Sequence, residues 1–152
     1  MPFRFLSCML GPMLLSLATT AIAQQTAVDG FVPQANLPVR ALALQDDGKI
    51  VVGGDFSTMN FQSFNRLARL HPDGNLDTGF FSPLNSGSVR SILVEDDGDL
   101  VIGGNGLVLN EIIVAGALAR MSSSGNTDVT FTPLLTGTVH VVISDGEGGY
   151  FV

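Results

Sequence analysis

Acidic residues in turns are the first candidates for chemistry in this sequence. Asp73, Asn75 and Asp77 place oxygen ligands at alternate positions, as the start of a calcium-binding loop does. A calcium-binding EF-hand loop also needs glycine at its sixth position and glutamate at its twelfth, where this chain has Thr78 and Leu84. We therefore interpret the segment as a β-turn in which the aspartate caps the backbone.

The remaining residue types give no catalytic or ligand set. Asp96, Asp97 and Asp99 form a second acidic cluster, which we also interpret as turn chemistry. The only cysteine, Cys8, lies in a segment that we predict is cleaved off, which excludes a thiol enzyme. Zinc-ligand clusters and the motifs G-x-S-x-G and H-E-x-x-H do not occur. We therefore assign no catalytic, cofactor-binding or metal-binding residue.

The recurring arginines are the polar feature that the sequence singles out. Arg40 and Arg90 share one position of a repeat, and Arg69 and Arg120 share another. We hypothesise that they bind turn carboxylates such as those of Asp77 and Asp128, or backbone carbonyls, through the planar guanidinium group. Ligand binding by these arginines is the alternative. The histidines are interpreted structurally: His71 as a solvated strand end, and His140 as a third occupant of the position of Arg40.

These residues belong to a repeat with a period of 50. The segment 39–55 reads VRALALQDDGKIVVGGD, the segment 89–105 reads VRSILVEDDGDLVIGGN, and a third copy starts at Val139. Two apolar runs around an Asp-Gly turn predict a β-hairpin. The Gly pairs at 53–54 and 103–104 lack the Lys-Ser/Thr of a phosphate loop, so we predict a bend where the strand ends and two backbones approach closely.

The rest of each copy predicts more strands. LARL at 67–70 returns as LARM at 118–121, and each copy then has a turn followed by Asp, Phe and Pro. One unit therefore holds about four short strands, as a β-propeller blade does. In the first strand, Val39, Ala41 and Ala43 alternate with Arg40, Leu42 and Leu44, so apolar residues occur on both faces. This pattern predicts a sheet that is covered on both sides.

The N-terminus predicts export. Residues 1–23 combine a basic start at Arg4, an apolar stretch and the A-x-A sequence of 21–23, which together indicate a signal peptide cleaved after Ala23. All 14 acidic residues lie beyond it, so an acidic mature chain argues against nucleic acid or anionic lipid as a partner. The apolar segment 107–119 is short and interrupted by polar residues, and we interpret it as strand rather than a membrane span.

The segments VRALALQDDGKIVVGGDF and NRLARLHPDGNLDTGF resemble the delta-60 repeat of bacterial exported and surface proteins. The resemblance covers most of the mature chain, but the second copy departs from it at 106–117, where an apolar stretch replaces the usual polar loop. The resemblance implies a β-propeller-like fold and an exported location. It implies no common activity and no catalytic residue.

The expected organisation is an all-β, β-propeller-like repeat array of four-stranded units, and an incomplete propeller. The expected boundaries are the signal peptide 1–23, the tail of a leading repeat and a linker 24–38, repeat 1 at 39–88, repeat 2 at 89–138, and the start of a truncated repeat 3 at 139–152. Propellers need four to eight blades, so we expect this chain to be a fragment of a longer array.

The expected function is a secreted, cell-surface or periplasmic repeat protein without enzymatic activity, acting as a scaffold or binding surface for protein or glycan. No cofactor and no membrane span in the mature chain are expected. Further blades of a longer chain, or self-association, would cover the ends of the array. The alternatives are the N-terminal fragment of a propeller-based hydrolase or lyase, or of a surface adhesin. The sequence identifies neither the ligand nor the number of blades.

Overall fold

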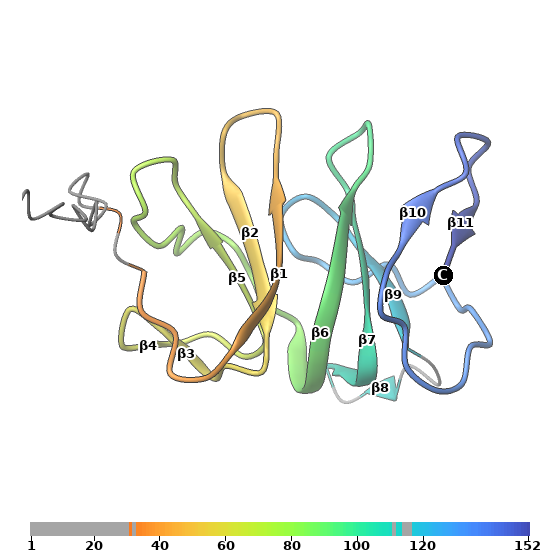
Figure 1. The fold of residues 1–152 in the computed structure, drawn as a ribbon, viewed down its shortest axis with the longest axis horizontal. Helices are drawn as coiled ribbons and strands as arrows, with labels where there is room; N and C mark the ends of the chain where they lie inside the picture. Colours follow the sequence, from red (N-terminus) through yellow and green to blue (C-terminus); the bar gives the residue numbers. More distant parts are fainter. Residues whose placement is uncertain (1–30, 32, 111, 114–116) are drawn as a thin grey trace, which may run out of the picture.

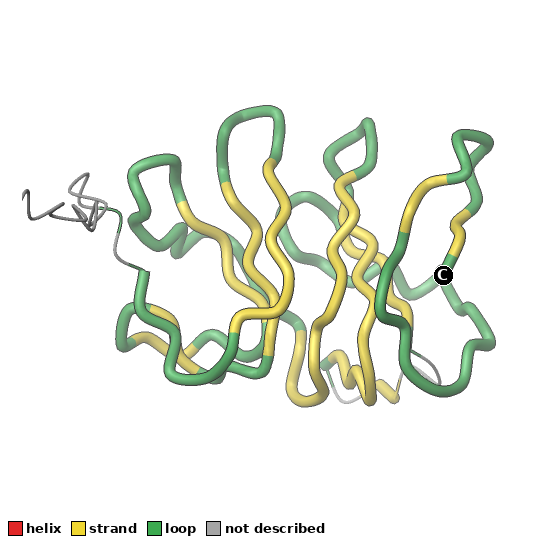
Figure 2. The backbone as a smooth tube through the Cα atoms, in the orientation of Figure 1, coloured by secondary structure: helices red, strands yellow, loops and turns green. Residues whose placement is uncertain are grey.

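The computed structural model describes residues 31, 33–110, 112–113 and 117–152, and its regular elements are all β-strands. The predicted signal peptide, residues 1–23, lies outside the described residues, as do residues 24–30 and 32 of the expected leading segment. The strands form separate antiparallel sheets, none of them closed, arranged in a row (Figures 1 and 2). The all-β expectation is therefore confirmed, and the open row agrees with an incomplete propeller.

The first unit contains a three-stranded sheet in the order β1-β2-β5, made by β1 (Val39–Leu44), β2 (Ile50–Gly54) and β5 (Leu67–Leu70). The turn at Asp47-Gly48 joins β1 to β2, and Gly48 has the positive φ of 81° that such a turn requires. The fourth strand expected for the unit is reduced to an isolated antiparallel β-bridge between Leu70 and Leu76. The short hairpin of β3 (Thr58–Met59) and β4 (Gln62–Ser63) lies beside this sheet.

The second unit repeats the plan with longer strands. β6 (Leu84–Val94) and β7 (Leu100–Leu109) pair along their length, and β8 (Ile112–Ile113) and β9 (Leu118–Met121) both pair with β7. A bridge from Met121 to Thr127 repeats the one at Leu70. β6 runs across positions 88 and 89, between which the sequence places the repeat boundary. The third copy forms the hairpin of β10 (Ile143–Ser144) and β11 (Tyr150–Phe151).

The apolar stretch of the second unit contributes to the core. β7 continues to Leu109, and Leu107 and Leu109 are buried between the first two units. This extension corrects our expectation that the strand ends at both Gly pairs: β2 ends at Gly54, but β7 runs on past Gly104. Among the described residues, no helix is long and apolar enough to cross a membrane.

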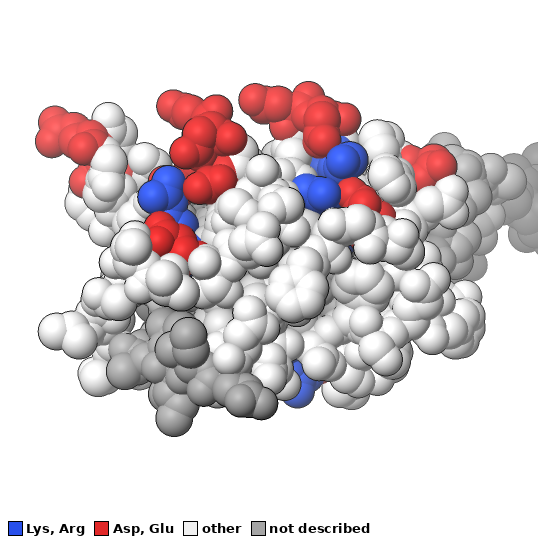
Figure 3. All heavy atoms as spheres, turned by 180° about the vertical axis from the view of Figure 1, so that it is seen from behind, with Lys and Arg blue, Asp and Glu red and all other residues white. Residues whose placement is uncertain are grey.

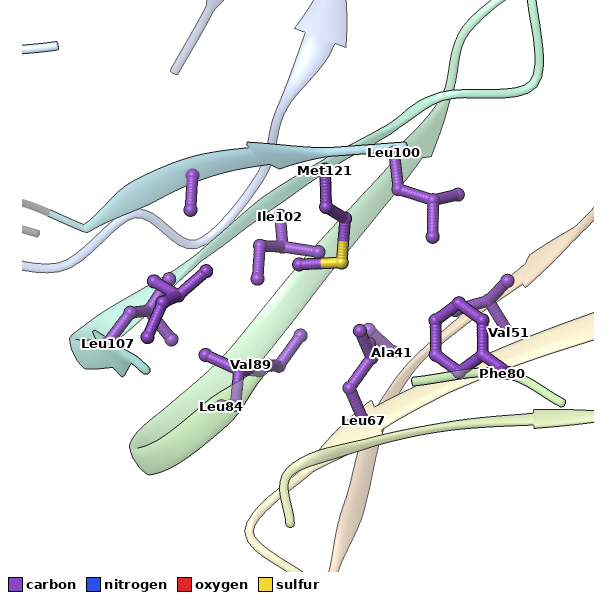
Figure 4. Close-up of a cluster of buried hydrophobic side chains, with 12 residues drawn as sticks. Ala41, Val51, Leu67, Phe80, Leu84, Val89, Leu100, Ile102, Leu107 and Met121 are labelled. Carbon is purple, nitrogen blue, oxygen red and sulfur yellow. The ribbon is translucent and has the colours of Figure 1, made fainter. Parts of the chain in front are cut away.

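The main core lies between units 1 and 2. One face of unit 1 contributes Ala41, Val51, Leu67 and Phe80, and the facing side of unit 2 contributes Leu100, Ile102, Ala119 and Met121 (Figure 4). A second core, with Val101, Leu118, Val139 and Val142, joins unit 2 to the third copy. Neighbouring units are thus held together by their apolar faces, as the blades of a propeller are.

One expectation about β1 is met only in part. The alternation of its residues predicts a sheet that is covered on both faces. Unit 2 covers the face with Ala41, and Val52 and Leu70 are buried on the other face, but the β1 residues of that other face are not covered. Leu42 and Leu44 are 66% and 70% exposed. The pattern indicates what the strand can bury. It does not show whether a neighbouring unit is present, and unit 1 has a neighbour among the described strands on one side only.

The Gly pairs bring two backbones close together, as expected. A Cβ atom at Gly104 would lie 2.0 Å from the carbonyl oxygen of Ser88, and one at Gly54 would lie 2.2 Å from that of Pro38. Backbone atoms cannot move aside as the end of a side chain can. The two glycines are therefore required by space, which explains why the pair recurs.

We predict that Gly104→Ala lowers the free energy of unfolding by about 2 kcal/mol or more, because overpacking of a rigid site costs about 1–3 kcal/mol. Thermal or urea unfolding followed by circular dichroism measures the loss. Gly79→Ala is the matched control, since its Cβ would meet only a carboxylate oxygen of Asp77, at 3.3 Å. Equal stability of the two variants would contradict the close approach at Gly104.

Candidate functional site

The candidate binding surface is the edge of the molecule where the hairpin turns lie. Acidic side chains gather along this edge, and the basic side chains on this side lie mostly just beneath them (Figure 3). We call it the acidic rim and define it by the exposed residues Asp46, Asp47, Asp73, Asp96, Asp97, Asp145 and Glu147. The rim exists because the acidic residues follow the turns of the repeat, and stacked units align their turns.

The rim carboxylates are occupied mainly by their own turns. Asp73 accepts a hydrogen bond from the backbone N–H of Asn75 at 2.9 Å, and Asp97 accepts one from that of Asp99 at 3.0 Å. The bond from Asn75 is the main reason why the pKa of Asp73 is lowered. The turn interpretation of both acidic clusters is thus confirmed. Within the described part of the chain, no group of three or more His, Cys, Asp or Glu side chains could hold a metal ion.

Arg69 organises the rim of unit 1 from below. Its Nε donates to a carboxylate oxygen of Asp77 at 2.9 Å, as the sequence predicts for this arginine. Nη1 donates to the backbone carbonyl of Ser123, which belongs to unit 2. The guanidinium also lies 4.7 Å from the centre of the Phe80 ring, so it contacts the apolar core as well. A structural role for Arg69 within and between units follows from these contacts.

The carboxylate of Asp77 is the partner that Arg69 needs in its ionised form. Burial opposes its ionisation, but hydrogen bonds from the N–H of Gly79 and from Arg69 outweigh it, and the pKa of Asp77 is lowered. Lys49 adds a second ion pair at 3.3 Å. A buried carboxylate with this many donors is a stable anchor for the turn that follows β5.

Arg120 occupies the position of Arg69 in unit 2 but has a different main partner. Its Nε donates to Glu95 at 2.6 Å, and Asp128 lies 3.7 Å away. Glu95 replaces Gln45 of unit 1, and a second carboxylate oxygen accepts a bond from the Tyr150 hydroxyl at 2.6 Å. The contact to Asp128 is therefore weaker than we expected. The link through Glu95 to the third copy was not foreseen.

Arg40 and Arg90 share a repeat position but not a partner. Arg40 donates to Asp55 through Nε at 2.8 Å, and this bond, followed by one from Ser88, lowers the pKa of Asp55 to about 2. Unit 2 has Asn105 where unit 1 has Asp55, and the buried Nε of Arg90 has no hydrogen-bond partner. The expectation that arginine at this position binds a carboxylate is therefore met by Arg40, and among the described residues no such bond is seen at the Nε of Arg90.

An apolar hollow is the second surface feature. It has a volume of about 270 Å³ and opens on the side of unit 1 that faces away from unit 2. Its lining is almost wholly apolar and combines the strands of unit 1 with the segment before them: Phe31, Pro33, Ala35, Val39, Leu42, Ile50, Val52, Met59 and Leu70. The sequence signal for it was Leu42, which we assigned, together with Leu44, to a covered face.

We predict that Arg69→Lys lowers the free energy of unfolding by about 1–2 kcal/mol, because lysine cannot reproduce the two-sided bonding to Asp77 and Ser123. Chemical unfolding measures this. Arg40→Lys is the control, since the ion pair of Arg40 is exposed to solvent and such pairs contribute little. If Arg69→Lys is no less stable than Arg40→Lys, the arginine does not anchor the units.

The only tyrosine of the chain, Tyr150, reports the contact between unit 2 and the third copy. Burial, followed by its bond to Glu95, raises the pKa of Tyr150 to about 12 from 10.0. Because the folded-state pKa is raised, this contribution to stability is complete below pH 10 and is lost as the pH rises toward 12.

We predict that ultraviolet absorbance, which detects the phenolate, titrates near pH 12 in the folded chain and near pH 10 in urea. Glu95→Gln removes the negative partner and moves the folded-state midpoint toward 10. A folded-state midpoint of 10 in the unaltered chain would contradict the contact.

A comparison with protein families agrees with this arrangement. Residues 45–80, from the first hairpin turn to Phe80, match a family described as "Domain of unknown function (DUF5122) beta-propeller". No significant match to this chain was found among curated proteins, and none among solved structures. The match supports placing the chain with β-propeller repeat proteins, and the stacked units of the structure have the corresponding architecture.

Proposed function

We propose that this chain is an exported repeat protein of the delta-60 type, without enzymatic activity, which serves as a scaffold and binding surface for protein or glycan. The observation that supports this best is the use of its polar residues. The recurring arginines Arg69 and Arg120 and their acidic partners bind one another or the backbone inside the stack. Polar groups that are engaged with one another in this way hold a surface in shape, which supports a binding role more than proton transfer to a substrate.

The acidic rim is the surface that we propose binds the partner. Its turns present polar groups at regular intervals along one edge, as repeat proteins present their binding residues (Figure 3). Its excess of carboxylates favours partners without a dense negative charge, which agrees with a protein or a neutral glycan and disfavours nucleic acid. Export would follow from the signal peptide at 1–23.

We predict that the chain, expressed in full in a bacterial host, is recovered outside the cytoplasm with Gln24 as its first residue. Cell fractionation and N-terminal sequencing measure this. A cytoplasmic product that retains residues 1–23 would contradict export. Replacing the A-x-A sequence through Ala21→Asp and Ala23→Asp is the control, because cleavage requires small residues there.

The absence of catalysis is tested with the purified product on arrays of glycans and of envelope proteins. We expect saturable binding from which the ligand is recovered with unchanged mass. A ligand that is bound and then released as cleaved product would favour the hydrolase or lyase alternative over the scaffold.

A further inference from the structure

Two apolar faces are left open in this structure, and the repeat shows what each should contact. The first is the hollow side of unit 1, which we call face A and define by Val39, Leu42, Leu44 and Ile50, around a buried floor of Val52 and Leu70. A bulge between Val39 and Ala41 places Val39 on this side with Leu42, not on the side of Ala41 as the alternation predicts. The second belongs to the third copy, which we call face B and define by Val141, Ile143 and Phe151. Leu42, Leu44, Val141, Ile143 and Phe151 are all more than half exposed.

Face A has a covered counterpart in the same chain. The positions of Val39, Leu42 and Ile50 are taken in unit 2 by Val89, Ile92 and Leu100. Those residues pack against Ala41, Val51, Leu67 and Phe80 of unit 1. Val89 is fully buried, whereas Val39 is 43% exposed. The same positions are therefore buried or half-buried where a preceding unit is present, and each is more exposed where none is described.

Face B has covered counterparts as well. Phe151 of the third copy occupies the position of Val51 in unit 1 and of Val101 in unit 2. Both valines are fully buried against the following unit, and Phe151 is 62% exposed. The equivalent of Val141 in unit 1 is Ala41, which is buried in the same contact. Face B thus has the residues that meet a face A elsewhere in the stack.

The segment before β1 already occupies part of this contact. Phe31 packs in the core of face A, as Phe80 packs between units 1 and 2 and Phe131 between unit 2 and the third copy. Ala35 forms a bridge to Met59, at the place where Leu84 pairs with Leu109 in unit 2. The segment around Phe31 and Ala35 thus corresponds to the end of a unit that packs on face A. Among the described residues, the first hairpin of that unit is the part that is missing.

The third copy is such a hairpin without a closing segment among the described residues. It cannot meet face A of its own chain, because the two lie at opposite ends of the row (Figure 1). We propose that face B of one molecule packs on face A of a second copy of this chain. The hairpin of one copy and the Phe31 segment of the other then form the two ends of a shared unit at the contact.

This contact joins two different faces, so it is heterologous. Each copy that adds a face A also offers a face B, and the assembly closes into a ring or grows as a filament. The inference does not depend on export or on the ligand of the proposed function, because it rests on the apolar faces alone. The rim remains accessible, since it lies at the turns and not on the faces (Figure 3).

The test combines two single variants with their mixture. Leu42→Glu places a charge on face A, and Phe151→Glu places one on face B, both at exposed positions of the single chain. The product of the full-length gene and each variant are compared by sedimentation velocity over a range of concentrations. We expect the unaltered chain to associate and each variant to associate about tenfold or more weakly.

The mixture distinguishes this contact from other modes of association. Leu42→Glu retains an intact face B and Phe151→Glu retains an intact face A, so together they should form a dimer of one copy of each that grows no further. This result is expected even if Phe151→Glu disturbs its own hairpin, because its face A is the side used. Leu134→Glu, which changes an exposed leucine outside both faces, is the matched control and should associate normally.

Three outcomes overturn the proposal. An unaltered chain that is monomeric at every concentration would show that face A and face B do not meet. Loss of association in Leu42→Glu but not in Phe151→Glu would show that face A pairs with itself. A mixture that stays monomeric while the unaltered chain associates would exclude the heterologous contact.

Discussion

The structure depends on the packing of one apolar face of a unit against the opposite face of the next. The residues that do this alternate along the strands, so a single hairpin supplies both faces and cannot bury either by itself. Val51 and Val52 illustrate the division: the first lies in the core shared with unit 2, and the second lies in the core on the other side of the same sheet. Stability in such a protein comes from the contacts between units more than from the units themselves.

The polar residues support this packing without competing with it. Arg69 binds Asp77 of its own unit and the backbone carbonyl of Ser123 in unit 2. Glu95 connects Arg120 with Tyr150 of the third copy. Both links join neighbouring units at the level of the rim, above the apolar contact. A buried or half-buried charge is tolerated here because each has several partners. The rim can therefore carry many carboxylates while the units beneath it remain tightly packed.

Much of this could be predicted from the sequence, because the repeat shows the same local pattern several times. The hairpins, the close approach at Gly54 and the pair of Arg69 with Asp77 follow from turn chemistry and repeat position. Features that differ between copies could not be found in this way. Arg120 prefers Glu95 because unit 2 has a glutamate where unit 1 has Gln45. The apolar residues after Gly104 indicated a strand, but the Gly pair indicated a bend before it, so the continuous strand to Leu109 was not foreseen.

The exposure of Leu42 marks the limit of reasoning from a repeat. The sequence pattern of unit 1 is that of a covered sheet, and in unit 2 the same pattern is covered. Whether Leu42 is buried depends on a neighbouring unit, and the sequence of the strand does not show whether that unit is present. An apolar position that is buried in one copy and open in another therefore shows where the stack has a free end. Among the described strands, the two ends of the row are both exposed. Each end has the type of apolar face that packs, elsewhere in the row, against a face of the other type. The association that we propose through these ends would follow from a fold whose units are complementary to one another.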